Sequence, residues 1–350
     1  MEHKTNPDFL LGDLLKRVSR SFYLTMRVLP KAQRVPISLA YLLARAADTI
    51  ADTPLVPSPR RLELLLSFRE QVNGPMREET LREIENALTQ QQTNSHEREL
   101  LQMLTPAVGL LSELTEADRA KVCEVVTTLT RGMEMDLTRF PPENAGKLDA
   151  LQNAAELDRY IYLVAGCVGE FWTKLNVAHV PALRHWNVEA MSACGIRYGK
   201  ALQMTNVLRD CPKDLRIGRC YMPREILSEC GLTPEDLLKP ENTSRARPML
   251  GKLMRVTLGH YEEAERYIVA IPRHCVRLRL ACMWPVLIGL ATLRELAANP
   301  RWLDPACPSV ISQRKCNGIL ALSLPAAASN AAIRAWMRRG RQSVIEAIGH

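Results

Sequence analysis

Two pairs of aspartates, each with three residues between its members, have the spacing that most directly suggests chemistry. Asp48 and Asp52 form one pair, and Asp210 and Asp214 form the other. Side chains four residues apart share one face of a helix, where two carboxylates repel each other unless a cation lies beside them. Mg²⁺ suits this role, because one or two carboxylates together with substrate phosphates usually bind it. The pairs therefore predict a two-sided magnesium–diphosphate site; the alternative is solvated helix ends, with Pro212 interrupting the second pair's helix.

Arginines precede both pairs. Arg45 lies three residues before the first pair, and Arg209 directly precedes the second. A guanidinium group can give two parallel hydrogen bonds to phosphate oxygens and stabilises negative charge on a leaving group. These arginines, with Arg20 and Arg219, are therefore candidates to bind a diphosphate. A solvated or ion-paired arginine is the alternative at each position.

Four motifs in a fixed order carry a resemblance to a known family. They are Ser19-Arg20-Ser21-Phe22; Arg45 with Asp48-x-x-x-Asp52; Tyr160-x-x-x-Val164-Ala165-Gly166-x-Val168-Gly169; and Gln203-x-x-Asn206-x-x-Arg209-Asp210-x-x-x-Asp214. With these motifs the chain resembles the squalene/phytoene synthase family of head-to-head prenyl transferases, over roughly residues 15–320.

The resemblance implies a role for each motif residue. It implies Mg²⁺ ligands at Asp48, Asp52, Asp210 and Asp214; diphosphate-binding residues at Ser19, Arg20, Ser21, Arg45, Gln203, Asn206 and Arg219; a cavity lined by Phe22, Tyr41, Val164, Ala165 and Gly169; and catalytic roles for Tyr160 and Arg209. The Tyr160 hydroxyl would accept or relay a proton lost as a cyclopropyl intermediate forms, whereas a core tyrosine with a satisfied hydroxyl is the alternative. The glycines of the third motif would leave room for a prenyl chain, serve close helix packing, or do both.

Two downstream stretches bear on the product. The residues from Arg277 to Leu293, and Val310-x-Ser312-x-Arg314-Lys315, are more similar to squalene synthases than to phytoene or dehydrosqualene synthases. This similarity implies that two farnesyl diphosphates are joined through presqualene diphosphate, which is then reduced with NADPH. It also implies that Arg314 or Lys315 binds the phosphate of NADPH. The chain has no Gly-x-Gly-x-x-Gly fingerprint, but the family binds the nicotinamide cofactor without a Rossmann fold.

Two alternatives stay open at this point. Within the same family, the chain could be a phytoene or dehydrosqualene synthase, or an enzyme that stops at presqualene diphosphate. In another class, it could be a non-catalytic helical scaffold. Retention of all four aspartates argues against the scaffold, because loss of metal ligands would be its simplest signature.

The composition bears on partners and location. The chain has 46 basic and 38 acidic residues, a net charge of +8 that fits anionic substrates or an anionic membrane face. No helix-turn-helix pattern or aromatic-interleaved basic stripe indicates nucleic acid. Ten cysteines without a Cys-x-x-Cys pair, and an N-terminus without an apolar signal core, indicate reduced intracellular thiols. We expect a cytoplasmic monomer, with peripheral contact at the inner membrane face as a further option.

Two segments near the C-terminus bear on the membrane. The strongest apolar run, residues 280–293, has 14 residues and contains Pro285, whereas a bilayer span needs about 20 residues. A buried core helix is therefore expected. Residues 332–350 are expected to form a short basic tail, solvated rather than bound to anionic lipid. Its arginines are Arg334, Arg338, Arg339 and Arg341.

Apolar residues recur at helical spacing along almost the whole chain, and 47% apolar content in 350 residues allows a large core. Helices are expected over residues 8–17, 36–52, 60–71, 97–104 and 115–139. Connections are expected over residues 90–96, 141–146, 214–223 and 239–248. We therefore predict an all-α fold in a single domain over residues 1–350. The resemblance implies an isoprenoid-synthase-type helical bundle around a large central cavity, with the aspartate motifs on facing helices at its mouth.

Overall fold

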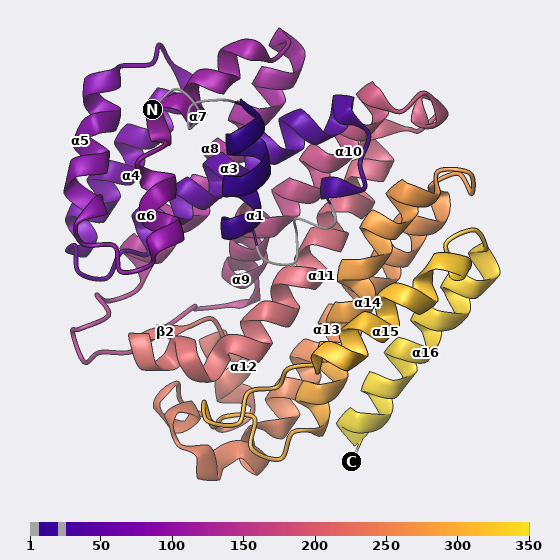
Figure 1. Ribbon diagram of the computed structural model, residues 1–350. Coiled ribbons are helices and arrows are strands. Elements are labelled where there is room, and N and C mark those ends of the chain that lie inside the picture. Colours follow the sequence, from indigo (N-terminus) through magenta and orange to yellow (C-terminus); the bar gives the residue numbers. More distant parts are fainter. Residues whose placement is uncertain (1–6, 20–25, 350) are drawn as a thin grey trace. The chain divides into compact units, whose positions relative to one another are not determined.

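The computed structural model describes residues 7–19 and 26–349, and helices dominate them, which confirms the all-α prediction (Figure 1). The chain divides into two compact units. The first consists of Met1–Arg139 and Lys174–Val180, and the second of Phe140–Thr173 and Pro181–His350. Each unit is described by itself below. The expectation of one domain around a central cavity stays a prediction.

The first unit is built around α3, which carries the first aspartate pair. Its elements are η2 (Phe9–Leu14), α1 (Leu15–Val18), α3 (Lys31–Ala51), α4 (Ser58–Asn73), α5 (Glu78–Thr89), α6 (Ser95–Leu101), α7 (Leu104–Gly109), η3 (Leu110–Glu113) and α8 (Glu116–Arg139). Helices α3, α4 and α8 pack against one another and bury Leu42, Leu43 and Phe68. Thr115 caps the start of α8, since the Asp118 N–H donates to Thr115 Oγ1 at 3.2 Å.

The second unit is built around α11, which carries the second aspartate pair. Its elements are β1 (Asp149–Ala150), α9 (Ala154–Ile161), η4 (Tyr162–Gly166), η5 (Pro181–Leu183), α11 (Val188–Asp214), η6 (Leu215–Ile217), β2 (Arg219–Cys220), α12 (Arg224–Glu229), η7 (Glu235–Leu238), η8 (Pro240–Asn242), α13 (Thr243–Ala270), α14 (Val276–Ala298), α15 (Gln313–Ala326) and α16 (Asn330–Gly349). Helix α10 (Cys167–His179) begins here, and its last residues belong to the first unit. The two short strands pair in parallel, and α11 packs chiefly along α13.

Prolines interrupt the helices less than the sequence suggested. Pro212 lies inside α11, which continues to Asp214, so the second aspartate pair shares one helix as expected. The connection expected over residues 239–248 is wrong in its second half, because α13 begins at Thr243 and includes Pro248. A proline removes one backbone hydrogen bond from a helix, and burial of the flanking apolar residues Met249 and Leu250 offsets that loss.

The solvated C-terminal tail expected over residues 332–350 is also wrong, because this segment belongs to helix α16. Ile333, Met337 and Val344 recur at helical spacing and are fully buried. The helix packs against α13 and α14, and its Arg341 pairs with Glu265 of α13. The segment is basic, but the apolar side chains along one face of its helix are buried in the core of the unit.

Helix α14 contains the apolar run over residues 280–293. Within the described part of the chain it is the one helix long and apolar enough to cross a membrane, and 67% of its most apolar window is buried. It packs against α11, α13, α15 and α16 (Figure 1). These contacts support the expected buried core helix.

Glycines bring α11 into backbone contact with the segment that follows Tyr160. A Cβ atom added to Gly169 would lie 1.8 Å from the carbonyl oxygen of Gly195, and one added to Gly199 would lie 2.2 Å from that of Ala165. No side chain fits at either crossing. Gly169 therefore serves close helix packing at a position that the resemblance had assigned to the cavity wall.

We predict that Gly195→Ala destabilises the protein although alanine is the better helix former. Its Cβ would lie 2.6 Å from the Gly169 carbonyl oxygen and 2.7 Å from Thr173 Oγ1. Overpacking of this kind costs about 1–3 kcal/mol. Urea unfolding measures the effect, with Gly259→Ala in α13 as the matched control. No heavy atom lies within 4 Å of that added Cβ, so the control should gain up to about 1 kcal/mol. Equal stability of the two variants would contradict the packing argument.

Candidate active site

The first aspartate pair lies at the C-terminal end of α3. Asp48 is in the last turn, and Asp52 caps the helix, its N–H donating to the Asp48 carbonyl oxygen at 2.9 Å. Burial and the neighbouring Asp52 carboxylate raise the pKa of Asp48 to about 7, although 36% of its side chain is exposed. The two carboxylates therefore repel each other as expected, and a cation beside them would relieve that repulsion.

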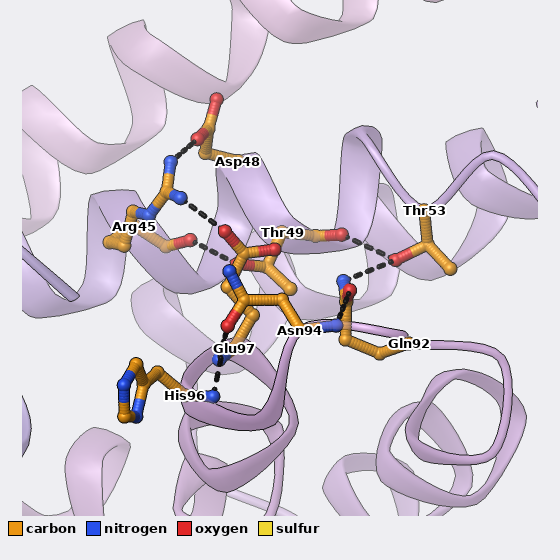
Figure 2. Close-up of polar contacts among 8 residues, drawn as sticks. All are labelled: Arg45, Asp48, Thr49, Thr53, Gln92, Asn94, His96 and Glu97. Atoms are coloured by element: carbon orange, nitrogen blue, oxygen red, sulfur yellow. Dashed lines mark hydrogen bonds and ion pairs between the residues drawn. The ribbon is translucent and has the colours of Figure 1, made fainter. Parts of the chain in front are cut away.

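Arg45 bridges two carboxylates in this region. One terminal nitrogen of its guanidinium pairs with Asp48 on the same helix, and the other pairs with Glu97 of α6 (Figure 2). Burial opposes the charge of Arg45, but the carboxylates of Asp48 and Glu97 hold its pKa above its ordinary value. Sequence reasoning missed Glu97, which lies 52 residues from Arg45 in the chain. The only local signal was an Asn94 cap three residues before it.

The second aspartate pair shows a related arrangement on α11. Arg209 Nε donates to Asp210 Oδ1 at 2.9 Å, and its Nη2 donates to Oδ2 of the same carboxylate. This hydrogen bonding raises the pKa of Arg209. Both side chains stay about one third exposed. In each pair, therefore, an arginine of the same helix neutralises the first aspartate.

The remaining polar residues of the fourth motif continue along the same helix. Gln203, Asn206 and Asp214 are partly exposed, whereas the intervening Met204, Val207 and Leu208 are buried. Spacings of three and four residues place Gln203, Asn206, Asp210 and Asp214 on one face of α11. Arg219 of β2, by contrast, donates to Glu143 at 3.0 Å, so its positive charge is already paired.

Tyr160 lies in an aromatic group of the second unit. It is 5% exposed, at the end of α9, and stacks on Tyr221 with ring centroids 4.6 Å apart. Phe140 packs edge-on against the same Tyr221, with centroids 5.1 Å apart. No sequence motif had indicated Tyr221. Directly after α9 comes the π-helical turn η4, whose Val164 and Ala165 are half-buried; such turns occur frequently at functional sites.

The other predicted site residues are placed as follows. Arg20, Ser21 and Phe22 lie outside the described residues. Ser19 and Tyr41 belong to the first unit; Ser19 is buried, and its hydroxyl has no hydrogen-bond partner within residues 7–19 and 26–349. Arg314 and Lys315 lie in the first turn of α15, where Arg314 is exposed and Lys315 Nζ donates to Glu295 of α14 at 2.6 Å.

The donor chemistry of both pairs fits Mg²⁺. Within the described residues, no group of three or more His, Cys, Asp or Glu side chains forms a complete metal cage. Each pair offers two carboxylates on one helix turn. Mg²⁺ usually keeps several waters and binds one or two carboxylates plus phosphate oxygens, so two carboxylates are a sufficient protein contribution. Bound at either pair, the ion would compete with the arginine for the first aspartate.

We predict that Asp48→Asn and Asp210→Asn each weaken divalent-cation binding and leave the fold intact. Each change removes one anionic oxygen donor but almost no packing volume. Titration with Mn²⁺, followed by its electron paramagnetic resonance signal without substrate, measures the affinity. Asp236→Asn, the same chemical change in η7 outside both pairs, is the control. Unchanged Mn²⁺ affinity in both test variants would contradict the metal assignment.

Comparisons with known proteins agree with the motifs. A family model described as squalene/phytoene synthase matches residues 15–314. The chain is 27% identical over 289 residues to squalene synthase ERG9 of Gibberella zeae, covering 83% of this chain and 58% of that protein. It is 28% identical over 275 residues to a bifunctional lycopene cyclase/phytoene synthase of Colletotrichum graminicola, covering 74% and 41%. The fold is similar to that of TcSQS in complex with the ligand E5700, at a TM-score of 0.77 and 20% identity, with 99% of each chain covered.

Proposed function

The chain belongs to the squalene/phytoene synthase family of prenyltransferases, and we propose that it is a squalene synthase. It would join two farnesyl diphosphates head to head through presqualene diphosphate and reduce the product with NADPH. The observation that carries the proposal is the pair of aspartate clusters, each with an arginine on its first carboxylate. The chain spans less than two thirds of the length of the curated relatives it matches, such as 58% of the Gibberella zeae protein.

The aspartate and arginine residues would act on the diphosphate groups. Bound Mg²⁺ supplies positive charge that neutralises the diphosphate as its bond to the allylic carbon breaks. Asp48, Asp52, Asp210 and Asp214 would hold the ions. Arg45 and Arg209, relieved of their aspartate partners, would donate hydrogen bonds to the diphosphate oxygens. Gln203 and Asn206, on the same face of α11 as the second pair, would complete the polar rim.

Tyr160 would act on the carbon skeleton. Departure of the first diphosphate leaves an allylic cation, which the double bond of the second substrate attacks to form the new carbon–carbon bond. Closure of the cyclopropane ring then releases one proton, which the departed diphosphate accepts either directly or through the Tyr160 hydroxyl, whose oxygen takes this proton as its own O–H proton passes to the diphosphate. The faces of Tyr160 and Tyr221 carry negative charge density that favours a nearby cation. Their burial supports a site that excludes water.

Arg314 and Lys315 are proposed to bind NADPH. They lie at the N-terminus of α15, where backbone N–H groups and two cationic side chains favour an anionic phosphate. Bound there, NADPH would supply the hydride for the reductive step. Glu295 holds Lys315 in this structure and would be exchanged for the phosphate.

The alternative is a family member without the reductive step: a phytoene or dehydrosqualene synthase, or a presqualene diphosphate synthase. Its support is the 28% identity to the bifunctional phytoene synthase. A non-catalytic scaffold has less support, because both aspartate pairs are retained with their arginines.

Location and oligomeric state stay predictions. A cytoplasmic monomer with peripheral membrane contact is proposed on the strength of exposed apolar and cationic side chains near the C-terminus. Leu322 and Leu324 of α15 are 66% and 55% exposed, and Arg334, Arg338 and Arg339 of α16 are exposed as well. Such a combination suits an anionic lipid surface.

We predict that product identity depends on NADPH. Incubation of the purified protein with farnesyl diphosphate and Mg²⁺ should give presqualene diphosphate or unreduced hydrocarbons without NADPH, and squalene with it. Mass spectrometry of the extracted products measures this. If the product is the same in both incubations, the alternative without the reductive step holds, and the identity of that product distinguishes its members.

We predict that Tyr160→Phe lowers the turnover number by about 10²–10⁴-fold, the range for a lost general acid or base. Phenylalanine keeps the stacking on Tyr221, so the free energy of unfolding should change by no more than about 1–2 kcal/mol. Tyr162→Phe is the matched control. It removes a hydroxyl that donates to Glu170 at 3.2 Å, and it should keep turnover within a few-fold. A loss of stability with unchanged turnover in Tyr160→Phe would show a structural role, and a selective loss in Tyr162→Phe would move the proton transfer there.

A further inference from the structure

Glu97 is fixed in position by contacts that do not involve Arg45. The Asn94 side chain caps α6 by accepting from the N–H of His96 and from that of Glu97 itself. Gln92, just before this cap, donates to Thr53 Oγ1 at 3.4 Å, and Thr53 donates to the Thr49 carbonyl oxygen of α3 at 2.7 Å. Figure 2 shows this chain of contacts, which ties the start of α6 to the end of α3. The Glu97 carboxylate is therefore held beside the aspartate pair from a second helix.

The guanidinium of Arg45 divides its two terminal nitrogens between Glu97 and Asp48 (Figure 2). Arg45 and Glu97 are 25% and 19% exposed, and Arg45 Nε has no partner among the described residues. If a cation binds Asp48, only one terminal nitrogen of Arg45, the one that donates to Asp48, loses its partner. The other nitrogen stays on Glu97, so the guanidinium keeps its place and offers a donor to an incoming anion.

In the second cluster, no carboxylate from another helix within residues 7–19 and 26–349 forms an ion pair with the arginine. There Arg209 places both Nε and Nη2 on the single carboxylate of Asp210. A two-point pair of this kind is stronger than a one-point pair, and a cation must displace more to reach the aspartate. Without Glu97, Arg45 could donate two hydrogen bonds to the Asp48 carboxylate, as Arg209 does to Asp210.

We propose that Glu97 is a positioning residue: it shares Arg45 with Asp48, keeps that aspartate accessible to a divalent cation, and holds the guanidinium ready for the diphosphate. This inference rests on the proposed function, because it requires that Asp48 bind a cation. It adds a residue from outside the four sequence motifs to the machinery of the first cluster.

The test measures Mn²⁺ affinity without substrate, in an Asp210→Asn background that isolates the first cluster. Glu97→Gln should weaken Mn²⁺ binding about tenfold or more, the equivalent of one charge-assisted hydrogen bond gained by Asp48 from Arg45. Glu97→Asp should weaken it too, because it keeps the charge but is one methylene too short to reach Arg45. This second variant also keeps the proposal testable if Glu97→Gln does not fold.

The matched control is Glu99→Gln on the same helix. Glu99 pairs with Arg17 of α1 at 2.8 Å. Glu99→Gln also removes one ion pair of α6, so it should lower the melting temperature about as much as Glu97→Gln does. It should leave the Mn²⁺ affinity unchanged. If all three variants bind Mn²⁺ as the parent does, Glu97 only ties α6 to α3, and the inference is wrong while the metal assignment stands.

A double-mutant cycle with Arg45→Met separates action through Arg45 from a direct effect of the Glu97 charge. In the Arg45→Met background, Glu97→Gln should change Mn²⁺ affinity by about twofold or less, because residues that act through one contact are not additive. An equal loss in both backgrounds would overturn the inference in favour of a direct charge effect. If the parent itself binds no Mn²⁺, the metal assignment of the proposed function fails first, and Glu97 loses its role with it.

Discussion

Repulsion between carboxylates one helical turn apart is the interaction on which the candidate site depends. Partial burial and the neighbouring Asp52 carboxylate raise the pKa of Asp48, and the guanidinium of Arg45 opposes that rise. On α11, Arg209 pairs with the carboxylate of Asp210. Each cluster is therefore neutralised by a group that a cation can replace, and the replaced group is itself suited to a phosphate. Under the proposed function, the same residues would neutralise each other in the protein without ligand and provide the binding groups for the metal and the diphosphate.

A second constraint is the backbone contact between α11 and the segment after Tyr160. Gly169 contacts Gly195, and Ala165 contacts Gly199, without intervening side chains, so these two contacts define the register between the segments. Tyr160 lies five residues before the first of these contacts, and the polar face of α11 begins four residues after the last. Small residues at the crossing therefore set the position of the tyrosine relative to Gln203 and Asn206.

Periodicity and motif spacing predicted what depends on local sequence. The helices that carry both aspartate pairs follow from residues that are neighbours in the chain. Glu97 and Tyr221 could not be found in this way, since their contacts to Arg45 and Tyr160 join residues 52 and 61 positions apart. The prediction of a solvated tail over residues 332–350 was wrong because it was based on the arginines of this segment. Its apolar stripe is sparse, and the residues that bury the stripe lie far away in the chain, on α13 and α14.

The arginine arrangement has a thermodynamic consequence under the proposed function. A cation that binds Asp48 must break an existing ion pair, and a diphosphate that binds Arg45 must break the same one. The first ligand to bind loses the free energy needed to break the Arg45–Asp48 ion pair. The second ligand then binds a side chain that is already released from this pair. Binding of either ligand therefore raises the affinity for the other, by the same factor in both directions. Such a protein binds metal and diphosphate together more readily than it binds either one alone. Cations without substrate therefore occupy the carboxylates less, and the metal is bound most tightly when the diphosphate that it must neutralise is present.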